Sequence, residues 1–334
     1  MGAKLFGARV KRLEDPALLT GRGRFVDDVK LPGVLHACFV RSPHAHARLR
    51  GIDTKPAMGI PGVHMVLTAD DLPKPMRSQA MPMLLPNPAI VVPRTQTALA
   101  RDEVNYVGQP IAVVIADTRY IAEDAATSMT VDFEVLDAVC DCRDAIKDGA
   151  AHAHSDLDSN IVAKFALAYG DIDAAFADAA HVFNEMIWQH RGGAMALETR
   201  AVLASHDPVT DVLTVWSGTQ TPHIGRRMLA DLCGRELESI RVIAPDVGGG
   251  FGPKAIFYPE EAVIPAAALK FGRPVKWIED RREHFLCTTQ ERDQYWRSRL
   301  RSIPMAGFSA CVAECCMTAA HSCHGASSCR ISPR

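Results

Sequence analysis

The sequence predicts a mixed α/β (α+β) protein with two domains. The chain has 334 residues, which exceeds the usual size of one domain, and 48% of them are hydrophobic, which is ample for a buried core. Short β-type runs alternate with stretches of helical spacing along most of the chain. The formal net charge of −2 excludes a strong nonspecific attraction to nucleic acid or to an anionic membrane.

Residues 1–140 are expected to form the first domain. The apolar run at 111–116 is typical of a strand buried on both faces, and the helical pattern and strand that follow it predict a β-α-β unit. Proline interrupts residues 72–98, which predicts a long irregular connection. The elements expected in this domain are strands at 35–40, 63–67, 111–116 and 131–135 and a helix at 119–129.

A polar, Asp-rich stretch at 141–155 predicts a linker, and residues 156–296 are expected to form the second domain. Asp171 can cap a short helix that runs to Ala179. The elements expected after this helix are strands at 181–188, 201–205, 212–216, 240–244 and 275–278 and helices at 222–233 and 259–271.

A glycine-rich loop, DVGGGFGPK at residues 246–254, lies between a predicted strand and a predicted helix. Glycine permits positive φ angles and leaves backbone N–H groups bare, so a ligand can approach the main chain closely. The loop is not a P-loop, because Pro253 separates the last glycine from Lys254, and its glycine spacing is not the G-x-G-x-x-G of dinucleotide sites. The alternative is a tight turn that binds nothing.

Gln220 stands at a predicted strand end in the segment WSGTQTPH, residues 216–223. Its carboxamide could donate a hydrogen bond to an oxo group while its carbonyl oxygen accepts another. The simpler interpretation is a residue at the start of a helix, since threonine and proline favour that position.

Together these two segments resemble the large subunit of the molybdenum hydroxylases, the family of xanthine dehydrogenase, aldehyde oxidase and aerobic carbon monoxide dehydrogenase. The resemblance extends over residues 9–296. It includes four further motifs in the order of the family: GRGRFVDD at 21–28, VRSPHAHAR at 40–48, YVGQP at 106–110 and PVKWIEDR at 274–281.

The resemblance implies an N-terminal α/β hammerhead domain followed by the first part of a molybdopterin-binding domain. It implies an oxidoreductase subunit that hydroxylates or oxidises an aldehyde, an N-heterocycle, CO or a similar small molecule. The implied cofactor is molybdopterin with molybdenum, in its cytosine dinucleotide form. Electrons would pass to iron–sulfur (Fe-S) and FAD partner subunits, in a homodimer of heterotrimers.

The resemblance also implies roles for individual residues. In the family, the glutamine matching Gln220 hydrogen-bonds an oxo ligand of the metal, and the residues matching Gly249, Gly250, Phe251 and Gly252 pack beside the metal. The catalytic base of the family lies in a segment that the resemblance does not reach, so no catalytic residue is assigned here. No protein side chain is expected to ligate the metal.

Other residues are interpreted from their local patterns. Ala255 stands where purine-oxidising members have a glutamate, which argues against purine recognition of that kind. Glu198 and Arg200 match a family M-E-x-R segment and are interpreted as a structural ion pair near the cofactor. The two H-x-H segments, at 44–46 and 152–154, lack a third ligand and are interpreted as surface residues.

The cellular location follows from the apolar runs. None of them approaches the ~20 residues of a membrane helix, and the N-terminal residues lack the apolar core of a signal peptide. We therefore expect a cytoplasmic protein without a membrane span.

Residues 297–334 lie beyond the resemblance and are expected to be a non-native, Cys-rich tail. When the codons are read from their third base, Met305 and Ala306 give GGC, which encodes glycine. Residues 300–317 can then be rewritten as AVDTDGRLLGVRGRMLHD, a strand-turn-strand pattern with a D-G turn. We therefore expect a frameshift near Arg297. A zinc site is the alternative, but the cysteines lack paired C-x2-C spacing.

A chain shortened in this way would lack the second cofactor-binding domain and the catalytic glutamate of the family. This chain alone is therefore expected to be inactive, although its family is one of enzymes, and the alternative function is a catalytically inactive remnant of a molybdenum hydroxylase large subunit.

Resequencing the gene tests the frameshift. We expect independent reads to differ by one base near the codon of Arg297, and the restored frame to continue through the family sequence. Independent reads with the same frame from residue 290 to residue 334 would contradict the frameshift.

Overall fold

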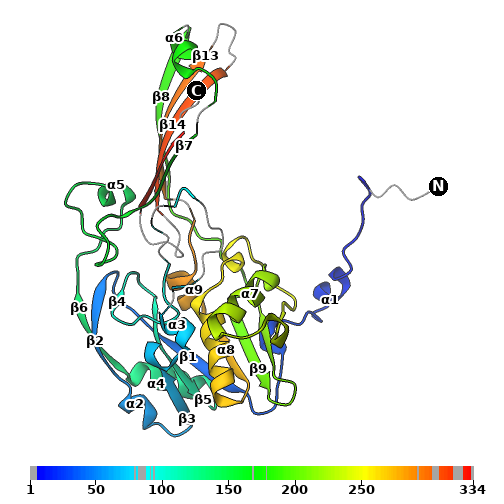
Figure 1. The fold of residues 1–334 in the computed structure, drawn as a ribbon. Coiled ribbons are helices and arrows are strands. Elements are labelled where there is room, and N and C mark those ends of the chain that lie inside the picture. The colour runs from blue at the N-terminus through cyan, green and yellow to red at the C-terminus, as the bar shows by residue number, and fades with distance from the viewer. Residues whose placement is uncertain are drawn as a thin grey trace.

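The computed structural model describes residues 6–78, 80–81, 88–90, 92, 95–167, 169–177, 179–291, 293–302, 308–318 and 326–331. A seven-stranded mixed sheet forms the centre of the molecule (Figure 1). Its strands, in spatial order, are β11 (Ile240–Ile243), β10 (Val212–Ser217), β9 (Ala201–Asp207), β12 (Val275–Ile278), β1 (Leu35–Arg41), β5 (Pro110–Ala116) and β3 (Val63–Leu67). The parallel pairing of β1 with β12 joins strands from the two predicted domains into this one sheet.

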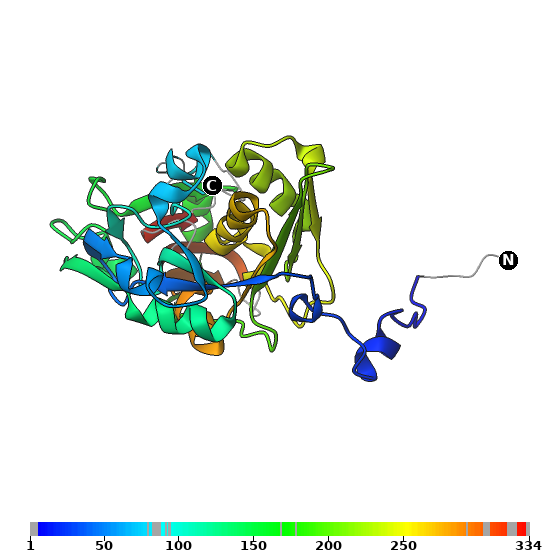
Figure 2. The same ribbon diagram turned by 90° about the horizontal axis from the view of Figure 1, so that it is seen from below.

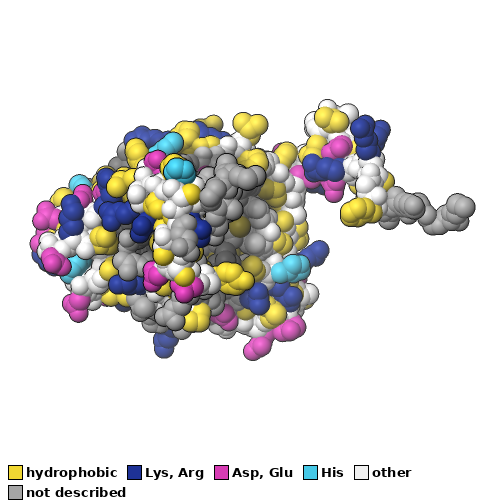
Figure 3. Space-filling model, turned by 90° about the horizontal axis from the view of Figure 1, so that it is seen from above, with side chains coloured by type: hydrophobic (Ala, Val, Ile, Leu, Met, Phe, Trp, Pro, Cys, Tyr) yellow, Lys and Arg dark blue, Asp and Glu magenta, His cyan; other side chains and the backbone are white. Residues whose placement is uncertain are grey.

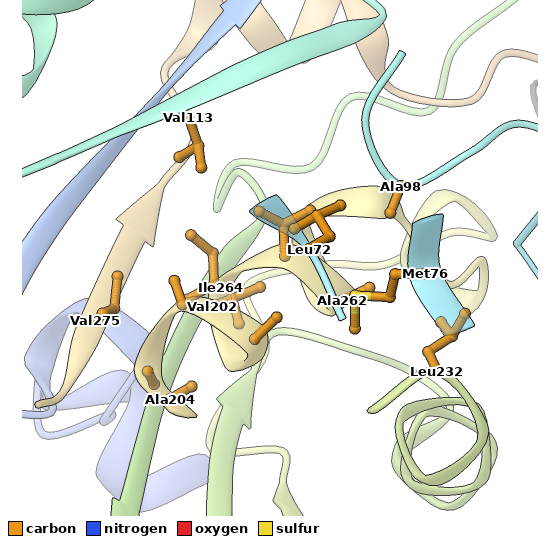
Figure 4. Close-up of a cluster of buried hydrophobic side chains, with 14 of the residues drawn as sticks. Leu72, Met76, Ala98, Val113, Val202, Ala204, Leu232, Ala262, Ile264 and Val275 are labelled. Carbon is orange, nitrogen blue, oxygen red and sulfur yellow. The ribbon is translucent and has the colours of Figure 1, made fainter. Parts of the chain in front are cut away.

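The hydrophobic core lies between this sheet and helix α8 (Pro259–Phe271). Val202 and Ala204 of β9, Val275 of β12 and Ile264 of α8 converge there (Figure 4). Nine residues of helix α8 are buried, and all of them except Glu260 are apolar. Helix α7 (Pro222–Cys233) packs against α8 and β11, and Figure 2 shows both helices beside the sheet from below.

The second sheet is small, and its strands come from the N-terminal part of the chain. It contains β4 (Glu103–Val104), β2 (Ala47–Asp53) and β6 (Thr130–Val135) in that order. The predicted β-α-β unit has the expected elements, with α4 (Arg119–Ser128) between β5 and β6. It is not a parallel unit, however, because β6 pairs antiparallel with β2, where its apolar side chains pack against Leu49 and Ile52.

A third, five-stranded sheet extends away from the other two (Figure 1). Its order is β7 (Ile161–Leu167), β15 (Ala326–Ile331), β14 (Phe308–Thr318), β13 (Gln294–Ser302) and β8 (His181–Gln189). All nine residues of β8 are exposed. Seen from above, the molecule shows hydrophobic side chains scattered among charged ones (Figure 3). Strand β13 crosses the expected frameshift position and pairs antiparallel with β14, whereas the frameshift itself stays a prediction.

The remaining helices are short. They are α1 (Asp15–Leu19), α2 (Lys55–Met58), α3 (Lys74–Ser78), α5 (Cys142–Ala145), α6 (Ile172–Ala177) and α9 (Arg281–Cys287). The predicted cap of α6 is confirmed, because Asp171 Oδ1 accepts a hydrogen bond from the Ala174 N–H at 3.0 Å. Within the described residues, no helix is both long enough and apolar enough to cross a membrane.

Two buried arginines connect the central sheet to α8 and α9. Arg200 Nη1 lies 3.0 Å from Glu260 Oε2 and its Nε lies 2.9 Å from Glu279 Oε1. Arg41 on β1 lies 2.8 Å from the other Glu260 oxygen and 2.9 Å from Glu283 Oε1. Burial alone would raise the pKa of Glu260, but Arg200 and Arg41 hold it below its usual value. We call these five residues the buried ion network.

The network makes the fold sensitive to the loss of one charge. Arg200→Met leaves Glu260 with Arg41 alone and removes the guanidinium from Glu279, which keeps only His284 as an ion-pair partner, so we expect the free energy of unfolding to fall by about 3–5 kcal/mol. Arg119→Met breaks the exposed pair with Glu123 and should cost less than about 1 kcal/mol. Urea unfolding of both variants measures the difference. Equal losses in the two variants would contradict a structural role for the network.

Candidate functional site

The glycine loop lies between β11 and α8, and its backbone requires glycine at particular positions. Gly249 and Gly252 have φ angles of +99° and +104°, which side chains disfavour. Phe251 between them has a φ of +53° and a side chain that is 71% exposed. The loop therefore turns sharply and presents its apex outward.

Gln220 lies against this loop, as the sequence pattern predicts. Its Oε1 accepts a hydrogen bond from the Gly252 N–H at 3.0 Å, and its own N–H donates to the Lys254 carbonyl oxygen at 2.8 Å. A Cβ atom placed on Gly250 would lie only 2.5 Å from Gln220 Oε1. The carboxamide therefore extends across Gly250, and a side chain there would displace it.

Several donors of this site have no partner within the described residues. They are the Nε2 of Gln220 and the N–H groups of Gly249, Gly250 and Phe251, whereas the neighbouring Gly248 and Gly252 N–H groups are hydrogen-bonded. A cluster of backbone and amide donors binds oxygen atoms that carry negative charge. The site is therefore suited to an anionic or oxo-bearing ligand.

Glu198 is hydrogen-bonded to both ends of the loop. Its Oε2 accepts hydrogen bonds from the Gly248 N–H and from Lys254 Nζ, both at 2.7 Å. The predicted ion pair between Glu198 and Arg200 is wrong, because Arg200 turns into the buried ion network and Glu198 turns toward the loop. Each side chain finds an oppositely charged partner on another segment. The sequence analysis did not identify Lys254 as the partner of Glu198, although its position at the end of the glycine loop was a signal that it lies near the site.

The loop and the ion network border one small pocket, which Lys254 of the loop and Arg200 and Glu260 of the network help to line. Gly218 and Glu261 line it as well. Glu261 accepts hydrogen bonds from the Ser217 hydroxyl at 2.7 Å and the Tyr258 N–H at 3.0 Å. Burial raises the pKa of Glu261 to about 7. Its hydrogen bond from the Tyr258 N–H is part of the capping box that begins α8.

The two H-x-H segments are only partly at the surface. His46 and His154 are buried, which corrects the prediction of exposed histidines. His46 is held by the Asp137 carbonyl oxygen at 2.8 Å and lies 3.1 Å from Glu103. Across the described part of the chain, no three His, Cys, Asp or Glu side chains are grouped in a way that could hold a metal ion.

Another of the sequence motifs contacts the loop. The Arg24 N–H donates to Asp246 Oδ2 at 2.8 Å, and the Asp246 N–H donates to the Arg24 carbonyl oxygen at 3.0 Å. The GRGRFVDD segment is thereby fixed beside the start of the glycine loop.

The close contact at Gly250 yields a prediction. In Gly250→Ala the new Cβ displaces the Gln220 carboxamide, so the Gly252 N–H loses its acceptor. Because one hydrogen bond contributes about 1 kcal/mol, the Gly252 amide should exchange with solvent roughly fivefold faster. Hydrogen-exchange mass spectrometry of the loop measures this. Gly51→Ala, whose Cβ meets nothing within 4 Å, is the control. Unchanged exchange in Gly250→Ala would contradict the contact.

Known families match both parts of the chain. Residues 20–137 match the aldehyde oxidase and xanthine dehydrogenase a/b hammerhead domain. Residues 153–301 match the molybdopterin cofactor-binding domain, which reaches slightly beyond the limit of 296 expected for the resemblance.

Individual relatives agree with these matches. The nicotine 6-hydroxylase large subunit of Paenarthrobacter nicotinovorans is 40% identical over 87% of this chain and 35% of that protein. The carbon monoxide dehydrogenase large chain of Hydrogenophaga pseudoflava is 37% identical over 87% of this chain and 37% of that protein. Quinoline 2-oxidoreductase from Pseudomonas putida 86 superposes with a TM-score of 0.84 at 37% identity, over 91% of this chain and 38% of that chain.

The chain thus spans little more than a third of the length of these relatives. It carries a hammerhead domain and a molybdopterin cofactor-binding domain, and it belongs to the molybdenum hydroxylase large-subunit family.

Proposed function

We propose that this chain is the cofactor-binding front part of the large subunit of a molybdenum-dependent oxidoreductase. The observation that carries the proposal is the contact between Gln220 and the glycine loop, which gathers unpaired donors around one point of the surface. Gln220, Gly249, Gly250, Phe251 and Gly252 are the proposed cofactor contacts.

The donor set fits molybdopterin with its molybdenum. When bound, this group supplies two-electron redox chemistry that no amino-acid side chain provides. The protein would bind and orient it: Gln220 Nε2 could donate to one of its oxygen atoms, and the N–H groups of Gly249 to Phe251 would be further donors to the same group. Because Gly250 has no side chain, the Gln220 carboxamide lies close to its backbone, and a ligand could approach the same backbone.

The proposed substrate is a small molecule such as an N-heterocycle, an aldehyde or CO. The relatives include a nicotine hydroxylase, a quinoline oxidoreductase and CO dehydrogenases, which support this range. Ala255 disfavours a purine, since it offers no carboxylate to hydrogen-bond the ring. No residue of this chain is proposed as the catalytic base.

Electrons are proposed to leave through Fe-S and FAD partner subunits. A homodimer of such heterotrimers in the cytoplasm, with the cytosine dinucleotide form of the cofactor, completes the proposal. The large-subunit names of the relatives, which include a subunit of a dehydrogenase complex, support the partner subunits.

Cofactor content tests the proposal. The chain is purified from cells that make molybdopterin, its molybdenum is measured by mass spectrometry, and its pterin is measured by fluorescence after oxidation. We expect both to approach one per chain and to fall severalfold in Gln220→Ala, which removes the carboxamide. Gln189→Ala, on exposed strand β8, is the control and should keep both.

Wild-type chain that carries neither molybdenum nor pterin would overturn the proposal. That result would favour the inactive remnant. The product of a gene with the frame altered near Arg297, purified in parallel, would then test whether residues 297–334 account for the loss.

A further inference from the structure

One carboxylate oxygen connects the two ends of the glycine loop. Glu198 Oε2 accepts from the Gly248 N–H before the apex and from Lys254 Nζ after it, each at 2.7 Å. The Glu198 N–H also donates to the Gly248 carbonyl oxygen at 3.2 Å. The five residues between these ends, 249–253, therefore span a fixed distance.

The same contacts also fix Gln220. The Lys254 carbonyl oxygen accepts from the Gln220 N–H at 2.8 Å and from the Thr219 hydroxyl at 3.2 Å. The Lys254 side chain is thus tied to Glu198 while its backbone is tied to the strand end that carries Gln220. Displacement of Lys254 would move the carboxamide and the loop together.

Lys254 carries a buried charge that needs a partner. The Lys254 side chain is only 1% exposed, and a buried ammonium group is stable only beside an opposite charge. Glu198, whose side chain is 17% exposed, supplies that charge at 2.7 Å. A Cβ on Gly248 would lie 2.5 Å from the Glu198 Cβ, so the glycine at this position makes room for the acidic side chain.

We propose that Glu198 and Lys254 are positioning residues, which hold the glycine loop and Gln220 in the conformation that receives the cofactor. Neither side chain needs to touch the cofactor. The pair keeps the N–H groups of Gly249, Gly250 and Phe251 directed outward before the ligand arrives, which reduces the ordering that binding requires. The inference rests on the proposed function for the identity of the ligand, whereas the effect on the loop is independent of it.

The experiment compares Glu198→Gln, Lys254→Met and the double variant with the wild-type chain. Hydrogen exchange of peptides that cover residues 246–254 reports the loop without any ligand, and molybdenum and pterin content report binding. We expect at least tenfold faster exchange in each single variant and a severalfold loss of both molybdenum and pterin. The double variant should be no worse than either single variant, because it leaves no unpaired buried charge.

Glu283→Gln is the matched control, since it breaks another buried pair, with Arg41, in the ion network. It should lower the melting temperature and leave exchange in the loop unchanged. If Glu198 acted only on overall stability, Glu198→Gln and Glu283→Gln would have the same effect on the loop.

Loop exchange at the wild-type rate in Glu198→Gln would overturn the inference. Faster exchange with unchanged molybdenum and pterin content would also overturn it, because the loop conformation would then be irrelevant to binding. If the wild-type chain carries no cofactor while Glu198→Gln exchanges faster, the proposed function fails and the hold of Glu198 on the loop stands.

Discussion

Two buried arginines set the constraint on which the arrangement of this molecule depends. Arg41 ends β1 and Arg200 directly precedes β9, and β12 lies between these two strands in the central sheet. Both arginines reach Glu260 at the start of α8. A buried guanidinium requires carboxylates at hydrogen-bond distance, so the packing of β1, the start of β9, α8 and α9 is determined together. Helix α8 begins at Pro259, and four residues separate it from the end of the glycine loop at Lys254.

The sequence motifs meet in space through polar contacts of this kind. Lys276 in PVKWIEDR is buried and donates to the carbonyl oxygens of Asp27 and Val29 at 2.9 and 2.8 Å, beside GRGRFVDD. Arg41 in VRSPHAHAR donates to the Gly108 carbonyl oxygen of YVGQP at 3.1 Å. Segments more than 200 residues apart thus share hydrogen bonds, and the parallel pairing of β1 with β12 results from the same convergence.

Local pattern predicted the elements that contain long apolar runs. The run at 111–116 became β5 with every residue buried, and the apolar stretch at 259–271 became α8. Strand β2 was missed because arginines interrupt its apolar residues. Helix α9 was missed because charged residues dominate its start, although one of them, Glu283, pairs with Arg41. The resemblance brought Gln220 and the loop together. The partner of Glu198 could not be predicted, since contacts across distant segments leave no local periodicity.

The central claim is that Gln220 and the glycine loop enclose one ligand site for molybdenum. Crystals of the chain purified from cells that make the cofactor allow a direct test by anomalous diffraction on both sides of the molybdenum absorption edge. The account predicts one anomalous peak, beside the Gln220 carboxamide and the N–H groups of Gly249, Gly250 and Phe251. A molybdenum peak on another face of the protein, with the loop packed against side chains only, would contradict it.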